Sequence, residues 1–146
     1  MTATTQTTRA QSRQGFTILA RVAFGVACAA NLYGIYAPSQ PGPALFDGAD
    51  KVFHLLSFAL VMATGMLAGI PARWLALALV VHAVGSELIQ HLLLPNRSGD
   101  PLDVLADVIG ITLGALLAWS LTRLLRRRIR WTPAESDGPA GTDPDR

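Results

Sequence analysis

Four long apolar runs dominate the sequence and restrict what the chain can fold into. They cover residues 16–36, 52–70, 74–94 and 104–125. A run of about 20 apolar residues is long enough for a helix to cross the hydrocarbon core of a bilayer. Because 51% of the residues are hydrophobic and only 15% are charged, a soluble domain of this length would lack the charge to cover its surface. The sequence therefore predicts an all-α membrane protein, a four-helix transmembrane bundle.

Proline residues mark the ends of the first three runs. Pro38, Pro71 and Pro95 each stand where a helix has to stop, because proline lacks a backbone N–H and clashes with the preceding turn. The first 15 residues are rich in Thr and Gln, the last 15 are rich in Pro, Gly and Asp, and neither end has an apolar period. We therefore expect a disordered N-terminal tail over residues 1–15, a membrane domain over 16–125, and a basic and then disordered tail over 126–146.

The basic residues predict the orientation of the spans. Lysine and arginine near span ends favour the cytoplasmic side. With both termini inside, the cytoplasmic ends carry Arg9, Arg13, Arg21, Arg73 and the arginines between residues 123 and 130. Only Lys51 and Arg97 then lie outside. We therefore expect cytoplasmic N and C termini, and the arginines fit a membrane flank better than a nucleic-acid surface, so no nucleic-acid partner is expected.

Ionisable and amide side chains gather at the opposite ends of the spans. This polar cluster consists of Asp50, Lys51, His54, Glu87, Gln90, His91, Arg97, Asp100, Asp103 and Asp107. Helical spacing puts several of them on shared faces, because residues three or four apart are neighbours on a helix. An ionised side chain inside a span is costly, so Glu87 and Asp107 are expected to face the bundle, with Lys51 and Arg97 as the available cations.

The fourth apolar run also carries a pattern for close helix packing. Gly110 and Gly114 follow Asp107 at intervals of three and four residues. Small residues at this spacing let helix backbones approach one another in a membrane. We therefore expect the face that carries Asp107 to pack against a neighbouring helix.

The order and spacing of these residues resemble the VanZ-like family of bacterial membrane proteins. The resemblance covers residues 50–114 and rests on Asp50-Lys51 followed by His54 and Phe58, Glu87-x-x-Gln90, Pro95-x-Arg97, and Asp103 with Gly110 and Gly114 behind it. It implies functional-site positions at Asp50, Lys51, His54, Glu87, Gln90, Arg97 and Asp103. At Asp107 the family pattern usually has Asn, so this chain adds a carboxylate to the cluster, and we include Asp107 in the candidate ligand-binding set.

The resemblance implies a multi-pass protein of the bacterial cytoplasmic membrane that acts in the cell envelope and affects susceptibility to glycopeptides such as teicoplanin. Together with the mixed charges, it leads us to expect binding of, or action on, an anionic or polyprenyl-linked envelope lipid or its head group. Whether the chain is an enzyme stays open, with Glu87 or His54 as the candidate general base. The alternative is a non-enzymatic scaffold or interaction protein, whose cluster is a structural clasp between helices.

The remaining motifs give weaker indications of function. His82 lies deeper in its span, and we expect a hydrogen-bonded core histidine there. Glu87 and His91 have a four-residue spacing, but they lack the rest of a zinc motif, so no metal is expected. No glycine-rich phosphate loop or nucleophile elbow occurs, and we expect no cofactor. The sequence leaves the oligomeric state open.

Overall fold

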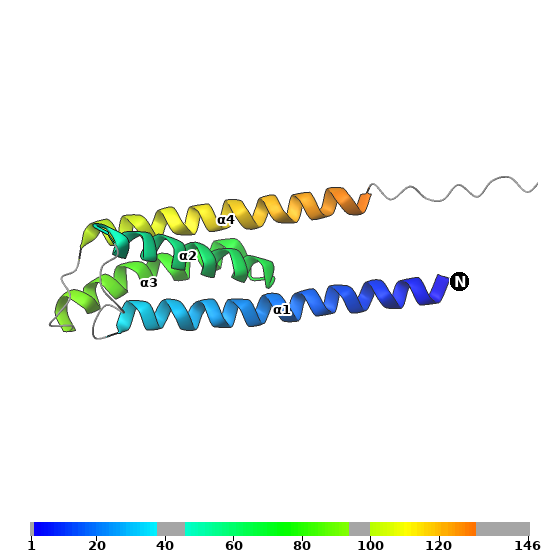
Figure 1. Cartoon of the computed structure of the whole chain (residues 1–146), viewed down its shortest axis with the longest axis horizontal. Coiled ribbons are helices and arrows are strands. Elements are labelled where there is room, and N and C mark those ends of the chain that lie inside the picture. The colour runs from blue at the N-terminus through cyan, green and yellow to red at the C-terminus, as the bar shows by residue number, and fades with distance from the viewer. Residues whose placement is uncertain (1, 38–45, 94–99, 131–146) are drawn as a thin grey trace, which may run out of the picture.

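The computed structural model describes residues 2–37, 46–93 and 100–130. These residues form four helices and no strand, and Figure 1 shows the four helices as one elongated bundle. The helices are α1 (Thr2–Tyr36), α2 (Ala49–Leu67), α3 (Ala72–Leu93) and α4 (Pro101–Arg130). Each contains a segment long and apolar enough to cross a membrane, at Gln14–Tyr36, Ala49–Leu67, Ala72–Leu93 and Pro101–Arg127. The prediction of an all-α protein with four transmembrane helices is confirmed.

The outer surface of the bundle is apolar. Only 28% to 33% of the most apolar stretch of each span is buried inside the structure. Large apolar side chains such as Leu19, Leu56, Trp74 and Leu93 are more than half exposed. An apolar surface of this extent is unfavourable in water, whereas lipid tails cover it without cost. The chain is therefore a multi-pass membrane protein.

Two helices are longer than the sequence pattern predicts. α1 begins at Thr2, whereas a disordered tail was predicted for residues 1–15. No proline or glycine interrupts residues 2–14, so each added residue extends the helix with one more backbone hydrogen bond. α4 likewise continues through the basic residues to Arg130. The disorder predicted beyond that point concerns residues outside the described part of the chain.

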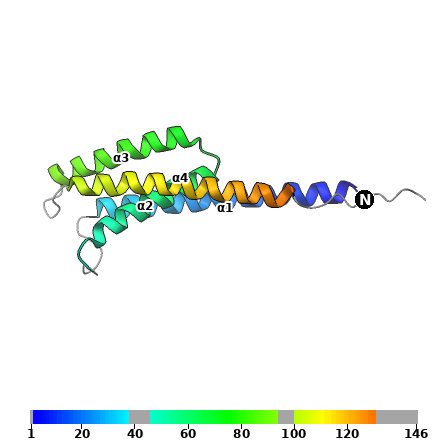
Figure 2. The same ribbon diagram turned by 90° about the horizontal axis from the view of Figure 1, so that it is seen from above.

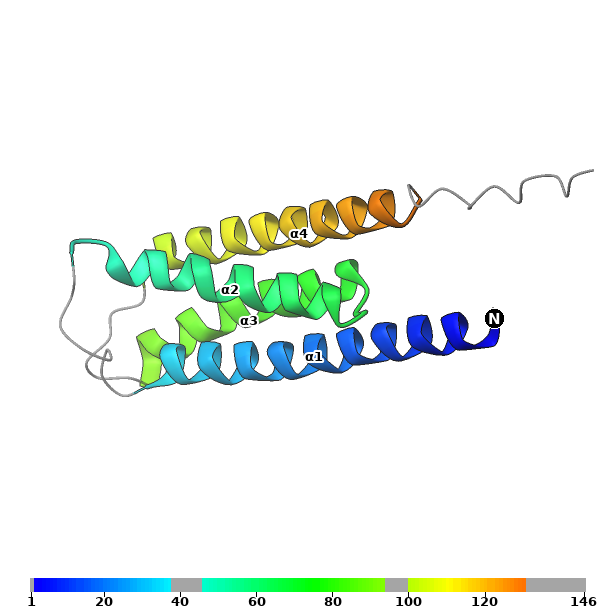
Figure 3. The ribbon, with the colours of Figure 1, turned by 45° about the vertical axis from the view of Figure 1, so that its right-hand side comes forward.

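The four helices alternate in direction along the chain. The N-terminal end of α1 and the C-terminal end of α4 lie at the same end of the bundle (Figures 1 and 3). Seen together, Figures 1 and 2 show α2 and α3 on opposite sides, each between α1 and α4. α2 and α4 consequently run parallel, and they make the most extensive contact in the bundle. Whether the shared end of the two termini faces the cytoplasm stays a prediction.

Glycines allow α2 and α4 to approach closely. A Cβ atom at Gly110 would overlap the backbone carbonyl of Leu55, and one at Gly114 would overlap the backbone carbonyl of Ala59. Both pairs are four residues apart on their own helix, so one face of α4 lies directly on one face of α2 over a full turn. The packing predicted for the Asp107 face is confirmed, with α2 as the partner.

Replacing Gly110 with alanine should separate α2 from α4. In an isolated helix, Gly→Ala gains about 1 kcal/mol, but here the added methyl group meets backbone that cannot rotate away. We expect Gly110→Ala to lower the free energy of unfolding by about 1–3 kcal/mol. The matched control is Gly85→Ala on α3, where nothing lies within 4 Å of the added Cβ, and which should be neutral or stabilising. Thermal unfolding of both variants in lipid nanodiscs measures the difference, and equal melting temperatures would contradict the close packing.

Candidate functional site

The start of α4 is fixed by its own sequence. The Oδ1 of Asp100 accepts a hydrogen bond from the backbone amide of Leu102 at 2.9 Å and so caps the helix. Pro101 occupies the first helical position, where a missing N–H costs nothing. Asp103 lies in the first turn, where the helix dipole favours a negative charge. These preferences place two carboxylates beside the beginning of α2.

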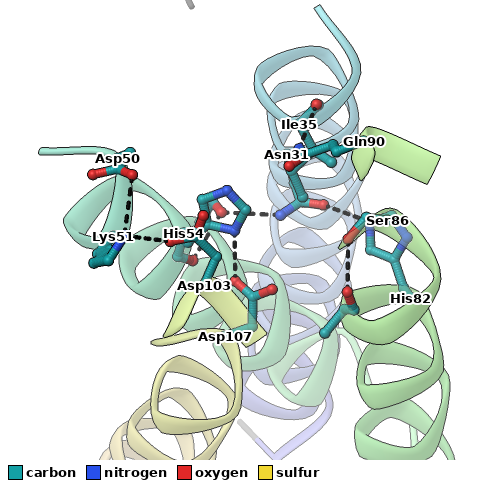
Figure 4. Close-up of polar contacts among 12 residues, drawn as sticks. Asn31, Ile35, Asp50, Lys51, His54, His82, Ser86, Gln90, Asp103 and Asp107 are labelled. Carbon is teal, nitrogen blue, oxygen red and sulfur yellow. Dashed lines mark hydrogen bonds and ion pairs between the residues drawn. The ribbon is translucent and has the colours of Figure 1, made fainter. Parts of the chain in front are cut away.

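Lys51 is surrounded by three carboxylates, and Figure 4 shows two of them, Asp50 and Asp103. Its Nζ donates to Asp100 Oδ2 at 2.7 Å and to Asp103 Oδ1 at 3.2 Å. A third hydrogen bond, of 3.3 Å, goes to Asp50 Oδ2, so the ammonium uses all three of its N–H donors. The Lys51 ammonium holds the pKa of the Asp100 carboxyl below its usual value. This group therefore ties α2 to α4.

One turn deeper, a histidine and a carboxylate form a second link between the same helices. His54 Nδ1 lies 3.0 Å from Asp107 Oδ1. Figure 4 shows the two side chains pointing toward each other. Only 4% of the His54 side chain and 1% of the Asp107 side chain are exposed. The Gly110 contact with Leu55 brings the backbones together next to this pair. Asp107 thus faces the bundle as predicted, and its partner among the described residues is a histidine on α2 and not Lys51.

Two buried carboxylate oxygens have no hydrogen-bond partner among the residues that the structure describes. They are Oδ2 of Asp107 and Oε1 of Glu87. Glu87, on α3, is half-buried. It also interacts electrostatically with His54, Asp103 and Asp107. Because buried polar atoms in folded proteins are nearly always paired, these two oxygens are the places where the site can accept a further donor.

A neutral hydrogen-bond network joins α1 to the neighbouring helices. Asn31 Nδ2 donates to Ser57 Oγ at 3.0 Å, and Asn31 Oδ1 lies 3.1 Å from His82 Nε2 (Figure 4). His82 also stacks on Phe58, with ring centroids 5.6 Å apart. The expectation of a hydrogen-bonded histidine at position 82 is confirmed. This network fixes α1 and α3 around α2 at a depth below the ionisable groups.

The structure brings together most of the predicted site residues. Asp50, Lys51, His54, Asp103 and Asp107 lie in one contiguous set of contacts between α2 and α4, and Glu87 interacts with this set from α3.

Three cluster residues lie apart from that set or outside the described chain. Gln90 donates to the backbone carbonyl of Ile35 at 2.9 Å and so joins α3 to α1. His91 is exposed. Arg97 belongs to the residues that the structure does not describe, and its predicted pairing with Glu87 stays a prediction.

Two polar residues of the network were not singled out from the sequence. Asn31 is 97% buried in α1, and Ser57 is its partner on α2. A lone asparagine within an apolar span is a usable signal, because its amide must find hydrogen-bond partners inside the membrane. Spacing within one span, however, does not tell which neighbouring helix supplies those partners.

The side chains of the site can transfer protons and can form hydrogen bonds with a ligand. A carboxylate that holds the Nδ1 of a histidine fixes the ring orientation, which is the arrangement used to position a general base. Within the described residues, no group of three or more His, Cys, Asp and Glu side chains is arranged to hold a metal ion.

Comparison with known proteins assigns the chain to no family. The chain matches no protein-family model, no curated protein and no solved structure. The fold and site define a four-helix, multi-pass membrane protein with a buried polar cluster at one end. The VanZ-like resemblance therefore remains a prediction from the residue pattern.

The contribution of the His54–Asp107 pair can be measured by two substitutions at one position. Asp107→Leu removes the partner of a buried imidazole and should cost about 1–3 kcal/mol of the free energy of unfolding. Asp107→Asn keeps an oxygen that can accept from Nδ1–H, so most of the stability should remain. Thermal unfolding in nanodiscs gives both values, with Asp47→Asn at an exposed position as the control. An unchanged melting temperature of the leucine variant would mean that the hydrogen bond contributes nothing.

Proposed function

We propose that the chain is a VanZ-like protein of the bacterial cytoplasmic membrane that binds, or acts on, an anionic envelope lipid through its polar cluster. In this proposal the cluster faces the outside of the cell, where envelope precursors and lipid head groups are present. The distribution of charge supports this orientation. Arg21, Arg73 and Arg123 lie toward the end of the bundle that holds the termini, and Lys51 lies toward the other end.

The observation that carries the proposal is the pair of unpartnered oxygens on Asp107 and Glu87. A clasp that served packing alone would satisfy its buried polar atoms, because each unsatisfied one costs free energy inside a membrane. A head group with hydroxyl or amine donors would supply the missing hydrogen bonds. Intramembrane ionisable residues that face the bundle interior commonly mark binding or transport sites.

The phosphate of such a lipid needs a cation. Lys51 already contacts Asp50, Asp100 and Asp103, so a phosphate at Lys51 would have to replace one of these carboxylates. Asp100 is the most exposed of the three. Arg97, outside the described residues, is the second candidate, since a guanidinium can hold phosphate by two hydrogen bonds.

The same cluster has groups that could catalyse a reaction of the bound lipid. His54 is oriented by Asp107 through Nδ1, which leaves Nε2 as the nitrogen that could exchange a proton with a bound head group. Glu87 is the second candidate for this role, because its carboxylate has an unpartnered oxygen. Turnover of a bound lipid would make the chain an enzyme, and retention without change would make it a binding protein.

The alternative is a structural clasp in a membrane scaffold, and specific contacts favour it. Lys51 and His54 both join α2 to α4, and Asn31 joins α1 to α2 and α3. Such contacts hold helices together without any ligand. Under this alternative, changes in the cluster alter stability but not lipid binding.

A lipid-binding and turnover assay separates these functions. Purified protein in nanodiscs should retain labelled phosphatidylglycerol or polyprenyl phosphate, and Glu87→Gln should weaken retention about tenfold or more, because a charged hydrogen-bond acceptor is lost. The variant should keep its melting temperature, and Asp47→Asn should behave like the wild type. Expression of the wild type should also change teicoplanin tolerance. A Glu87→Gln variant that melts earlier yet retains lipid normally would favour the clasp.

A further inference from the structure

Within the described residues, the site holds more carboxylates than cations. Between α2 and α4, Lys51 pairs with Asp103, and His54 pairs with Asp107. The single charge of Lys51 is also shared with Asp50 and Asp100. Glu87, which approaches from α3, has no cationic partner in hydrogen-bond contact within the described residues. A carboxylate at this depth needs a proton or a cation.

The same region has two carboxylate oxygens that accept no hydrogen bond from the described residues. Asp107 is 99% buried, and its Oδ2 has no partner within the described part of the chain even though Oδ1 is bonded to His54. Glu87 Oε1 is likewise buried and unpartnered, and the Glu87 carboxylate interacts electrostatically with Asp103 and Asp107. The missing component therefore has to bring positive charge and at least two N–H or O–H donors.

We infer that this interior binds a primary ammonium group, with Asp107 Oδ2 and Glu87 Oε1 as acceptors. A primary ammonium has one positive charge and three donors, which matches the charge and the acceptors on α3 and α4. A quaternary ammonium has the charge but no donor. A phosphate would be repelled by the carboxylates, and the described residues hold no cluster suited to a metal ion.

The ammonium most accessible to a site within a membrane bundle is that of an aminophospholipid head group. This identification rests on the proposed lipid-binding function, and it changes the ligand from an anionic lipid to a zwitterionic one whose phosphate and primary amine are both recognised. The amine would enter between α2, α3 and α4. The phosphate would stay at the level of Lys51, which lies three residues before His54 and so nearer the start of α2. A soluble amine has the same chemistry and is tested separately.

Lipid competition in nanodiscs tests the inference. We expect the wild-type chain to retain phosphatidylethanolamine about tenfold more strongly than phosphatidylcholine, whose quaternary amine cannot donate, because a charge-assisted hydrogen bond contributes at least this much. Glu87→Gln and Asp107→Asn should each bring the two lipids close to parity. Asp47→Asn is the control and should keep the preference. Free ethanolamine should displace phosphatidylethanolamine only weakly if the lipid is the ligand, and strongly if the site takes the soluble amine.

The outcomes distinguish this inference from the proposed function. Retention of phosphatidylglycerol or polyprenyl phosphate with no preference for the primary amine would overturn the inference and leave the proposed function standing. Retention of no lipid would overturn both. Glu87→Gln is expected to fold, since Glu87 is half-buried, so it decides the result even if Asp107→Asn fails to insert. If Arg97→Gln creates a primary-amine preference that the wild type lacks, the cation in the site is Arg97, and the inference is wrong.

Discussion

The close approach of α2 and α4 is the constraint on which the site depends. Gly110 and Gly114 let α4 lie against the backbone of α2 at Leu55 and Ala59. The same register brings Asp103 to Lys51 and Asp107 to His54, as the parallel direction of the two helices requires. Carboxylates in a span are unfavourable unless they find partners, and helices in a membrane associate through packing and polar contacts. The glycine contacts and the polar pairs therefore stabilise the same interface.

The polar groups form two levels with different consequences. At the deeper level, Asn31, Ser57 and His82 are neutral partners whose hydrogen bonds hold α1 and α3 in place. At the level of Asp107 and Glu87, two carboxylate oxygens have no hydrogen-bond partner among the described residues. The hydrogen bonds of the deeper level hold the helices in place, and the two oxygens of the upper level can accept hydrogen bonds from a ligand. This arrangement suits a preorganised binding site, because the protein does not have to rearrange to accept a ligand.

Much of the fold follows from the sequence, whereas the pairing of side chains does not. Run length and proline positions predict the four spans, and the spacing of Asp103, Asp107 and the glycines predicts one packed face of α4. Residue spacing gives a face but not the neighbouring helix, so the bond from Asp107 to His54 and that from Gln90 to the carbonyl of Ile35 required the structure. The N-terminal extension of α1 carries no apolar period, and pattern analysis consequently assigned it to a disordered tail.

The polar cluster is proposed to face the outside of the cell, and the accessibility of single cysteines to a labelling reagent measures this orientation directly. In a Cys28→Ser background, Asp47→Cys places a thiol at an exposed position just before α2, and Arg127→Cys places one at the opposite end of the bundle. A membrane-impermeant maleimide should label Asp47→Cys in intact cells and label Arg127→Cys only after the membrane is disrupted. Labelling of Arg127→Cys but not of Asp47→Cys in intact cells would put the cluster on the cytoplasmic side and contradict the account.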